Sequence, residues 1–173
     1  MKNILILLSC GALFACNHSN HESQNTEKPP VEIADPKYIE ISKSALTALC
    51  QGNVDGFIQS YSDDADFRWN YGDSLIGRQA IHEYWKERRS SVIDTISFTN
   101  EIWLAINANE PPKNVRPGVY VFSWADYAVT YKNGKTINMN IHMVFGFDNA
   151  DKVNFTYQYL DRLLISNALK PAE

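Results

Sequence analysis

The chain has 173 residues, of which 45% are hydrophobic, 12% aromatic and 21% charged, which are the proportions of a globular protein. Its formal charge of −4 excludes a basic surface of the size that binding to a nucleic-acid backbone requires, so we expect no nucleic-acid partner. After residue 16, no apolar run reaches the roughly 18 residues that a membrane-spanning helix needs.

Residues 1–15 have the pattern of a lipoprotein signal peptide. Met1-Lys2-Asn3 gives a positive start, and residues 4–15 form an apolar stretch too short to span a bilayer comfortably. The stretch ends in Leu13-Phe14-Ala15-Cys16, which resembles the lipobox where bacterial lipoproteins are cleaved before a lipidated cysteine. We expect palmitate on Cys16 and a lipid-anchored protein of the bacterial cell envelope, on the periplasmic face or the outer surface.

Two alternatives to this lipidation site stay open. Leu7-Leu8-Ser9-Cys10 is a second partial match, but it leaves an apolar region shorter than the roughly 7 residues that such segments need. The other alternative is an ordinary signal peptide with a chance cysteine at position 16.

Residues 16–36 are rich in Asn, Ser, His, Glu and Pro and predict a flexible tether. His18 and His21 lie in it without the further ligands that a metal site needs, so we expect no metal. Cys50 ends an apolar helical stretch, where a buried structural thiol is favoured over a nucleophile.

The expected domain, residues 37–173, begins with helical periodicity. The spacing predicts a helix over residues 37–51 that ends at Gly52. A second helix should follow, capped by Asn53, with an apolar face made of Val54, Phe57, Ile58 and Tyr61. After short extended segments, Gly77 opens a third helix over residues 78–89.

From Ser91 onward, the apolar spacing changes from helical to alternating. This pattern predicts strands over residues 96–106, 119–131, 136–148 and 153–165. Asn133-Gly134 is typical of the hairpin turn between the second and third of these strands. Three helices followed by a strand meander predict an α+β fold.

Several motifs, taken in this order, resemble the nuclear transport factor 2-like superfamily in its SnoaL-like branch. They are Gly52-Asn53-Val54-Asp55, Asp63-Asp64-Ala65, Gly77-Arg78-Gln79-Ala80-Ile81, Trp124, Asn133-Gly134-Lys135, Val144-Phe145-Gly146-Phe147-Asp148 and Tyr157-Gln158-Tyr159-Leu160-Asp161.

This resemblance covers about residues 38–165. It implies a cone-shaped α+β barrel, in which a strongly curved, mainly antiparallel sheet wraps three N-terminal helices, often as a homodimer. An apolar pocket would lie at the wide end. The superfamily includes isomerases, cyclases, hydrolases and non-catalytic binders, so the fold alone does not give the function.

Alternation assigns an inner and an outer face to the two central strands. The inward set on residues 136–148 is Ile137, Met139, Ile141, Met143, Phe145 and Phe147, and on residues 119–131 it is Tyr120, Phe122, Trp124, Asp126 and Ala128. The expected pocket binds a small apolar or aromatic molecule without a cofactor. Its expected lining is Tyr61, Trp69, Asn70, Trp85, Phe122, Trp124, Met139, Met143, Phe145 and Gln158. The alternative is that these side chains only fill the core.

Asp126 is the candidate catalytic residue. Beside aromatic side chains such as Trp124 its carboxyl group would be desolvated, which would raise its pKa and suit a general acid or base. The protein would then be a SnoaL-like lyase, isomerase or cyclase. Two alternatives remain: a buried hydrogen-bond network with Asn70, Tyr61 or Gln158, and a shifted strand that turns Asp126 to water.

The resemblance also lets two family mechanisms be compared with the sequence. The epoxide-hydrolase branch uses an Asp-Arg-Asp set, whose positions match Asp126, Trp124 and Gln158, so one of three is present. In ketosteroid-isomerase-like members, the protonated aspartate matches Met143, and the general base falls near Trp69 or Asn70. Both mechanisms are therefore disfavoured.

The histidines and the remaining motifs favour no other chemistry. His142 is expected on the outer face with Asn138 and Asn140, and His82 in solvent. The sequence has no cluster of residues at metal-ligand spacing, no Gly-rich phosphate loop and no Gly-x-Ser-x-Gly motif.

The outer face is expected to carry an aromatic patch that a homodimer would bury. Its expected members are Trp103, Val121, Tyr127, Val129, Tyr131, Tyr157 and Tyr159. A partner protein in the envelope, or residues 166–173 folding back over the patch, are the alternatives. A single bulge in the strand would exchange its faces beyond that point.

Overall fold

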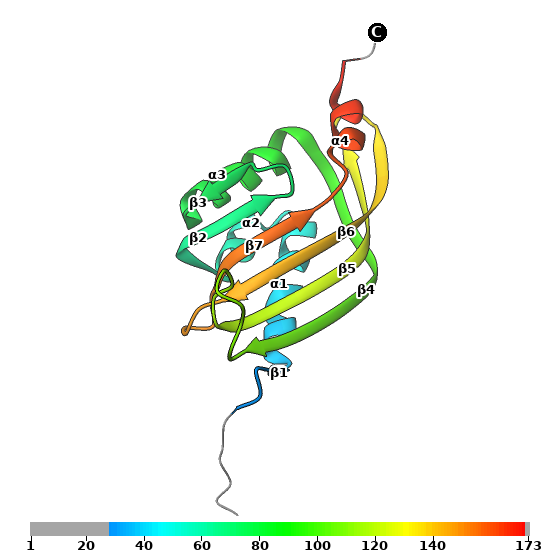
Figure 1. The fold of residues 1–173 in the computed structure, drawn as a ribbon. Helices are drawn as coiled ribbons and strands as arrows, with labels where there is room; N and C mark the ends of the chain where they lie inside the picture. Colours follow the sequence, from blue (N-terminus) through cyan, green and yellow to red (C-terminus); the bar gives the residue numbers. More distant parts are fainter. Residues whose placement is uncertain (1–27, 172–173) are drawn as a thin grey trace, which may run out of the picture.

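The computed structural model describes residues 28–171, which build one curved seven-stranded sheet (Figure 1). The strands are β1 (Val31–Ile33), β2 (Tyr61–Trp69), β3 (Ser74–Ile76), β4 (Ile93–Ala108), β5 (Gly118–Tyr131), β6 (Thr136–Phe147) and β7 (Val153–Tyr159). Their order across the sheet is β1-β4-β5-β6-β7-β2-β3, and each neighbouring pair is antiparallel except β2 and β7, which are parallel.

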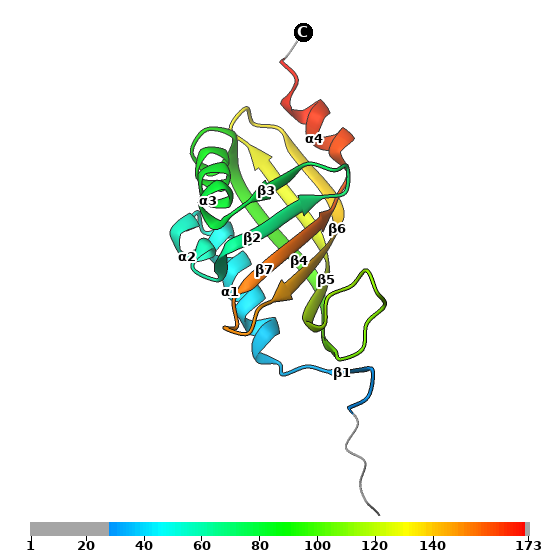
Figure 2. The same cartoon turned by 60° about the vertical axis from the view of Figure 1, so that its left-hand side comes forward.

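Three helices cover the inner face of this sheet, and a fourth lies at one end (Figures 1 and 2). They are α1 (Lys37–Cys50), α2 (Val54–Ile58), α3 (Arg78–Glu87), which continues into the π-helical turn η1 (Arg88–Val92), and α4 (Arg162–Leu169). The expected α+β cone is confirmed.

The break between α1 and α2 has a local cause. Gly52 adopts a φ of +77°, which is in the left-handed region that a glycine enters without strain. Asn53 then caps α2, because its side-chain oxygen accepts a hydrogen bond of 2.8 Å from the Gly56 amide. The expected cap at Asn53 is confirmed.

The elements differ from the sequence prediction in three places. Tyr61 was assigned to the second helix, but it opens β2, where Ala65, Phe67 and Trp69 are the other buried residues. Residues 31–33, expected in the tether, form β1 at the edge of β4. The last expected strand ends at Tyr159, because Asp161 caps α4 by accepting a hydrogen bond from the Leu163 amide.

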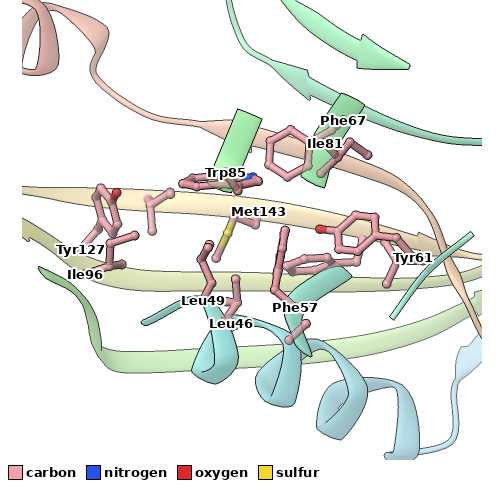
Figure 3. Close-up of a cluster of buried hydrophobic side chains, with 14 of the residues drawn as sticks. Leu46, Leu49, Phe57, Tyr61, Phe67, Ile81, Trp85, Ile96, Tyr127 and Met143 are labelled. Atoms are coloured by element: carbon pink, nitrogen blue, oxygen red, sulfur yellow. The ribbon is translucent and has the colours of Figure 1, made fainter. Parts of the chain in front are cut away.

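The core lies between the three inner helices and the sheet. Side chains from all three inner helices meet the sheet there, with Leu46 and Leu49 from α1, Phe57 from α2, and Ile81 and Trp85 from α3 (Figure 3). Phe57 is 1% exposed, and its ring centroid lies 5.0 Å from that of Tyr61 and 6.1 Å from that of Trp85. Packing of this kind is sensitive to the loss of a single ring.

Strand β5 presents the opposite face from the one predicted. The residues turned inward are Val121, Ser123, Ala125, Tyr127, Val129 and Tyr131, all of them buried. Residues directly opposite each other on neighbouring strands share a face, and Tyr127 pairs with Met139 while Ser123 pairs with Met143. The predicted inward set of Tyr120, Phe122, Trp124, Asp126 and Ala128 therefore lies on the outer face, and that prediction is wrong.

Strand β4 changes face along its length because it contains a bulge. The register with β5 shifts between Thr99 and Ile102, and Asn100 there has a φ of +52°. Beyond the bulge Trp103 points inward and stacks at 6.4 Å on Phe145, so its expected place on the outer face is wrong. Ile102 and Leu104 point outward instead.

Candidate functional site

One end of the cone holds a vestibule of about 660 Å³ between α3, α4 and the β2–β3 turn. A volume of this size lies within the range of small-molecule sites. Its lining residues are Trp69, Tyr71, Asp73, Ser74, Leu75, Tyr84, Arg88, Leu160, Arg162, Ile165, Ser166, Leu169, Lys170 and Pro171.

The vestibule continues toward the core as a narrow inner cavity of about 50 Å³. Trp69, Tyr84, Arg88, Leu160 and Ile165 line both spaces. The residues that line only the inner cavity are Leu49, Trp85, Ile93, Ile96, Phe98, Tyr127, Tyr131, Ile141 and Gln158. Figure 3 shows Tyr127 and Ile96 at one end of the buried cluster and Tyr61 at the other.

Helix α4 is fixed across the vestibule from two sides. On the β5–β6 hairpin, the Asn133 side-chain amide donates to the Ala168 carbonyl at 2.9 Å, and Lys135 Nζ donates to the Lys170 carbonyl at 3.1 Å. On the β2–β3 turn, Arg162 Nη1 forms an ion pair of 2.5 Å with Asp73 Oδ2. These contacts make α4 one wall of the site rather than a cover for the outer face of the sheet, where residues 166–173 were one expected alternative.

Several hydrogen-bond donors line the inner cavity. The guanidinium carbon of Arg88 lies 5.8 Å from the centroid of the Tyr84 ring. Burial raises the pKa values of the Tyr84, Tyr127 and Tyr131 hydroxyls, and the nearby positive charge of Arg88 offsets part of this rise. The three phenols therefore stay protonated at neutral pH and can donate.

The inner cavity offers no group that exchanges a proton near neutral pH. Its lining contains neither a carboxylate nor an imidazole. The one carboxylate of the vestibule, Asp73, is exposed and paired with Arg162. Across residues 28–171, no three His, Cys, Asp or Glu side chains lie together as metal ligands would.

Three of the predicted pocket residues lie in this site. Trp69 lines both spaces, and Trp85 and Gln158 line the inner cavity. The Trp69 indole Nε1 donates to Gln158 Oε1 at 3.0 Å, which fixes both side chains in the cavity wall. Sequence reasoning therefore found part of the apolar lining.

Other predicted pocket residues belong to the core or its edge. Tyr61, Met143 and Phe145 are each about 1% exposed, and the Tyr61 hydroxyl shares a hydrogen bond of 3.1 Å with Thr156. Met139 is half-buried against the core. Asn70 is exposed, with its amide donating to the Leu160 carbonyl at 3.3 Å. For Tyr61, Met143, Phe145 and Met139 the alternative, that they fill the core, is the better description, whereas Asn70 lies at the surface.

Phe122, Trp124 and Asp126 lie on the outer face of β5, so their predicted place in the pocket is wrong. The Asp126 carboxylate is exposed and accepts hydrogen bonds from the side-chain amides of Asn100 at 2.6 Å and Asn140 at 2.7 Å. A general acid in the cavity cannot be Asp126, because the sheet separates its carboxylate from that space. The alternative in which Asp126 faces water describes its position.

The two histidines of the domain lie away from the cavity. His142 is on the outer face, where its Nδ1 lies 2.9 Å from the Ser123 carbonyl oxygen and its ring stacks on Trp124 at 4.8 Å. His82 lies on the surface with Nε2 2.7 Å from Asp55. Neither imidazole lines the cavity.

The thiol of Cys50 is half-buried, and burial raises its pKa to about 11. A thiol with that pKa is protonated at neutral pH, as a structural cysteine would be. Cys16, His18 and His21 lie outside the described residues. None of the helices between residues 28 and 171 has the length and apolar character of a membrane-spanning helix.

Sequence reasoning missed the donors Tyr84, Arg88, Tyr127 and Tyr131 as site residues. Arg88 could be placed on the same side of α3 as Tyr84 and Trp85 from helical spacing. Tyr127 and Tyr131 were predicted on the outer face because the prediction exchanged the two faces of β5. The length of the β5–β6 hairpin could have shown which residues of β5 share a face with the inward residues of β6.

The structure resembles solved structures of other proteins, although its sequence matches none closely. No family model matches the sequence, and no curated protein matches it at a significant level. A protein of Xanthomonas campestris assigned as a polyketide cyclase has a similar structure, with a TM-score of 0.61 at 14% identity over 76% of this chain and 96% of that one.

Two further solved structures have the same architecture. A SnoaL-like polyketide cyclase assigned in Shewanella denitrificans has a TM-score of 0.55 at 17% identity, over 78% of this chain and 98% of that one. An LEH-like epoxide hydrolase of Mycobacterium tuberculosis has a TM-score of 0.57 at 13% identity, over 77% of this chain and 89% of that one. At these identities the likeness concerns the fold alone, which is the nuclear transport factor 2-like fold.

Proposed function

We propose that this chain is an envelope-anchored lipoprotein whose cone-shaped cavity binds a small, largely apolar or aromatic molecule. The observation that carries the proposal is the vestibule of about 660 Å³, which opens into the cone between aromatic and aliphatic side chains. Burial of an apolar ligand against such walls is favourable by roughly 25 cal/mol for each Å² removed from water.

The second candidate is a SnoaL-like lyase, isomerase or cyclase, which the fold shared with assigned polyketide cyclases favours. Such chemistry needs a proton carrier beside the ligand. Asp126 is on the far side of the sheet, and the phenols of the inner cavity hold their protons at neutral pH. Binding is therefore the function that the cavity supports better.

Blocking the vestibule is expected to weaken ligand binding strongly. Ile165 lines both the vestibule and the inner cavity, so Ile165→Trp should fill the entrance with an indole ring. We expect the affinity for phenylnaphthylamine, an uncharged fluorescent aromatic probe, to fall at least about tenfold, which corresponds to about 1.4 kcal/mol. The measurement is a titration followed by the emission of the probe.

The matched control is Leu163→Trp, which makes the same kind of change on the same helix at a side chain that is 67% exposed. It should leave the affinity within about twofold, a difference of less than about 0.5 kcal/mol. Trp124→Ala, on the outer face, should also leave it unchanged. Equal affinities for the two α4 variants would show that the probe binds elsewhere.

The lipid anchor is proposed from residues 1–16 and can be tested directly. In a bacterial host, wild-type protein should incorporate labelled palmitate, and Cys16→Ala should lose the label completely because the thioether-forming sulfur is gone. Cys10→Ala is the matched control and should keep the label. Loss of the label in Cys10→Ala alone would move the site to Cys10, and an unlabelled wild-type protein would favour an ordinary signal peptide.

We also propose that the chain forms a homodimer through the outer face of the sheet. The corrected faces place a row of apolar and aromatic side chains there, formed by Ile102, Leu104, Phe122, Trp124, His142, Val144, Tyr157 and Tyr159. Of these, Ile102 is 63%, Trp124 42% and Tyr159 44% exposed. The Trp124, His142 and Tyr159 rings stack in sequence at 4.8 and 5.4 Å, and one self-complementary surface of this kind can close on itself.

A further inference from the structure

The vestibule is positively charged in a chain whose net charge is −4. Three cationic side chains line it, Arg88, Arg162 and Lys170, against the single carboxylate of Asp73. Arg162 is paired with Asp73, and no carboxylate among residues 28–171 pairs with Arg88 or Lys170. A cavity with this charge attracts anions and repels cations.

Arg88 lies where the vestibule meets the inner cavity, because it lines both. Its Nε is enclosed and has no hydrogen-bond acceptor within the described part of the chain. An enclosed N–H group without an acceptor costs free energy, and a ligand acceptor at this point would recover that cost. Arg is also the side chain that binds a carboxylate through two parallel hydrogen bonds.

Further unpaired donors surround the inner cavity. The Trp85 indole Nε1 is enclosed without an acceptor. Tyr84, Tyr127 and Tyr131 also line this space. Among residues 28–171 their hydroxyls form no hydrogen bond, unlike the hydroxyls of Tyr38, Tyr61 and Tyr120. Guanidinium and indole groups can only donate, and protonated phenols can donate as well. A ligand group that accepts hydrogen bonds would therefore satisfy the unpaired donors at this end of the cavity.

We propose that the cavity selects apolar or aromatic molecules that carry an anionic oxygen group, such as a carboxylate, and that Arg88 with the Tyr84, Tyr127 and Tyr131 hydroxyls binds that group. The apolar body of the ligand occupies the vestibule against Trp69, Leu160 and Ile165. This inference rests on the proposed function, because it specifies the ligand class of the same cavity.

A pair of probes that differ in one anionic group tests this selection. Anilinonaphthalene sulfonate and phenylnaphthylamine share their aromatic body, and only the first is an anion. The folded wild-type protein should bind the anionic probe at least about tenfold more tightly. Arg88→Gln should lower the affinity for the anionic probe far more than the affinity for phenylnaphthylamine, so that the two probes then bind within about twofold of each other.

Two further variants of basic residues separate the Arg88 site from general charge effects. Lys86→Gln removes the same charge from an exposed position of α3 and should keep the preference for the anionic probe. Arg88→Lys keeps the charge without the planar fork, should retain part of the preference, and serves as the test if Arg88→Gln fails to fold.

The outcomes distinguish the two proposals. Equal binding of both probes by the wild-type protein, or an equal loss of both in Arg88→Gln, overturns the anion selection and leaves cavity binding in place. Failure of the wild-type protein to bind either probe overturns the proposed function and this inference with it.

Discussion

Phe57→Ala is expected to lower the free energy of unfolding by about 3–5 kcal/mol. Phe57 is 1% exposed and packs between Tyr61 and Trp85, so its removal leaves a cavity that rings on α3 and β2 cannot easily close. Because Trp85 also lines the inner cavity, loss of this support should loosen the binding site as well. Urea unfolding of the chain from residue 17, followed by far-ultraviolet circular dichroism, measures the change.

Leu163→Ala provides the comparison, because Leu163 on α4 is 67% exposed. That variant should change the free energy of unfolding by no more than about 0.5 kcal/mol. If Phe57→Ala cost less than about 1 kcal/mol with an unchanged urea dependence, the close packing of α2 against α3 and β2 would be contradicted.

Trp124→Glu is expected to convert the proposed homodimer into a monomer. Trp124 lies in the middle of the outer face, between Ile102 on β4 and His142 on β6. A glutamate there would bury an unpaired carboxylate from each protomer in the interface, which should weaken association at least about a hundredfold. Sedimentation equilibrium of the chain from residue 17, at micromolar concentration, should show the dimer in the wild-type protein and the monomer in the variant.

Leu163→Glu adds the same charge on α4, away from the outer face, and should leave the dimer intact. Trp124→Glu should also keep a wild-type melting temperature at low concentration, because Trp124 is 42% exposed. Tyr127→Glu would not serve this purpose, since Tyr127 is buried and its replacement would unfold the domain. A monomeric wild-type protein would contradict the homodimer and favour a different envelope partner for this face.

The sequence alone determined the order of most elements and the fold class. Apolar residues at helical spacing in residues 37–51 and 78–89 produced α1 and α3, because helix faces that cannot be solvated must pack. Alternation after Ser91 produced the long strands β4, β5 and β6, since one face of each is covered by the helices. The glycine and asparagine at positions 52 and 53 determined the break between α1 and α2 through local backbone geometry.

Alternation did not determine which face of a strand points inward. Both faces of β5 carry apolar side chains, so Phe122 and Val121 were equally acceptable inside, and only pairing with β6 decides between them. The hairpin sets that pairing: Thr130 lies opposite Thr136, so odd-numbered residues of β5 face odd-numbered residues of β6. Once Met139 and Met143 point inward, Tyr127 and Ser123 must follow, and Asp126 must face solvent.

The binding site itself was decided by tertiary structure. Arg88 on η1, Tyr84 on α3, and Tyr127 and Tyr131 on β5 are up to 47 residues apart in the sequence, and nothing local brings them together. They share one cavity because α3 packs across the inner face of the sheet, while α4 is held over the open end by Asn133 and Asp73. A pattern along the chain shows which side chains are apolar. Whether hydrogen-bond donors meet in one cavity depends on strand register and helix packing, and these are determined by long-range contacts.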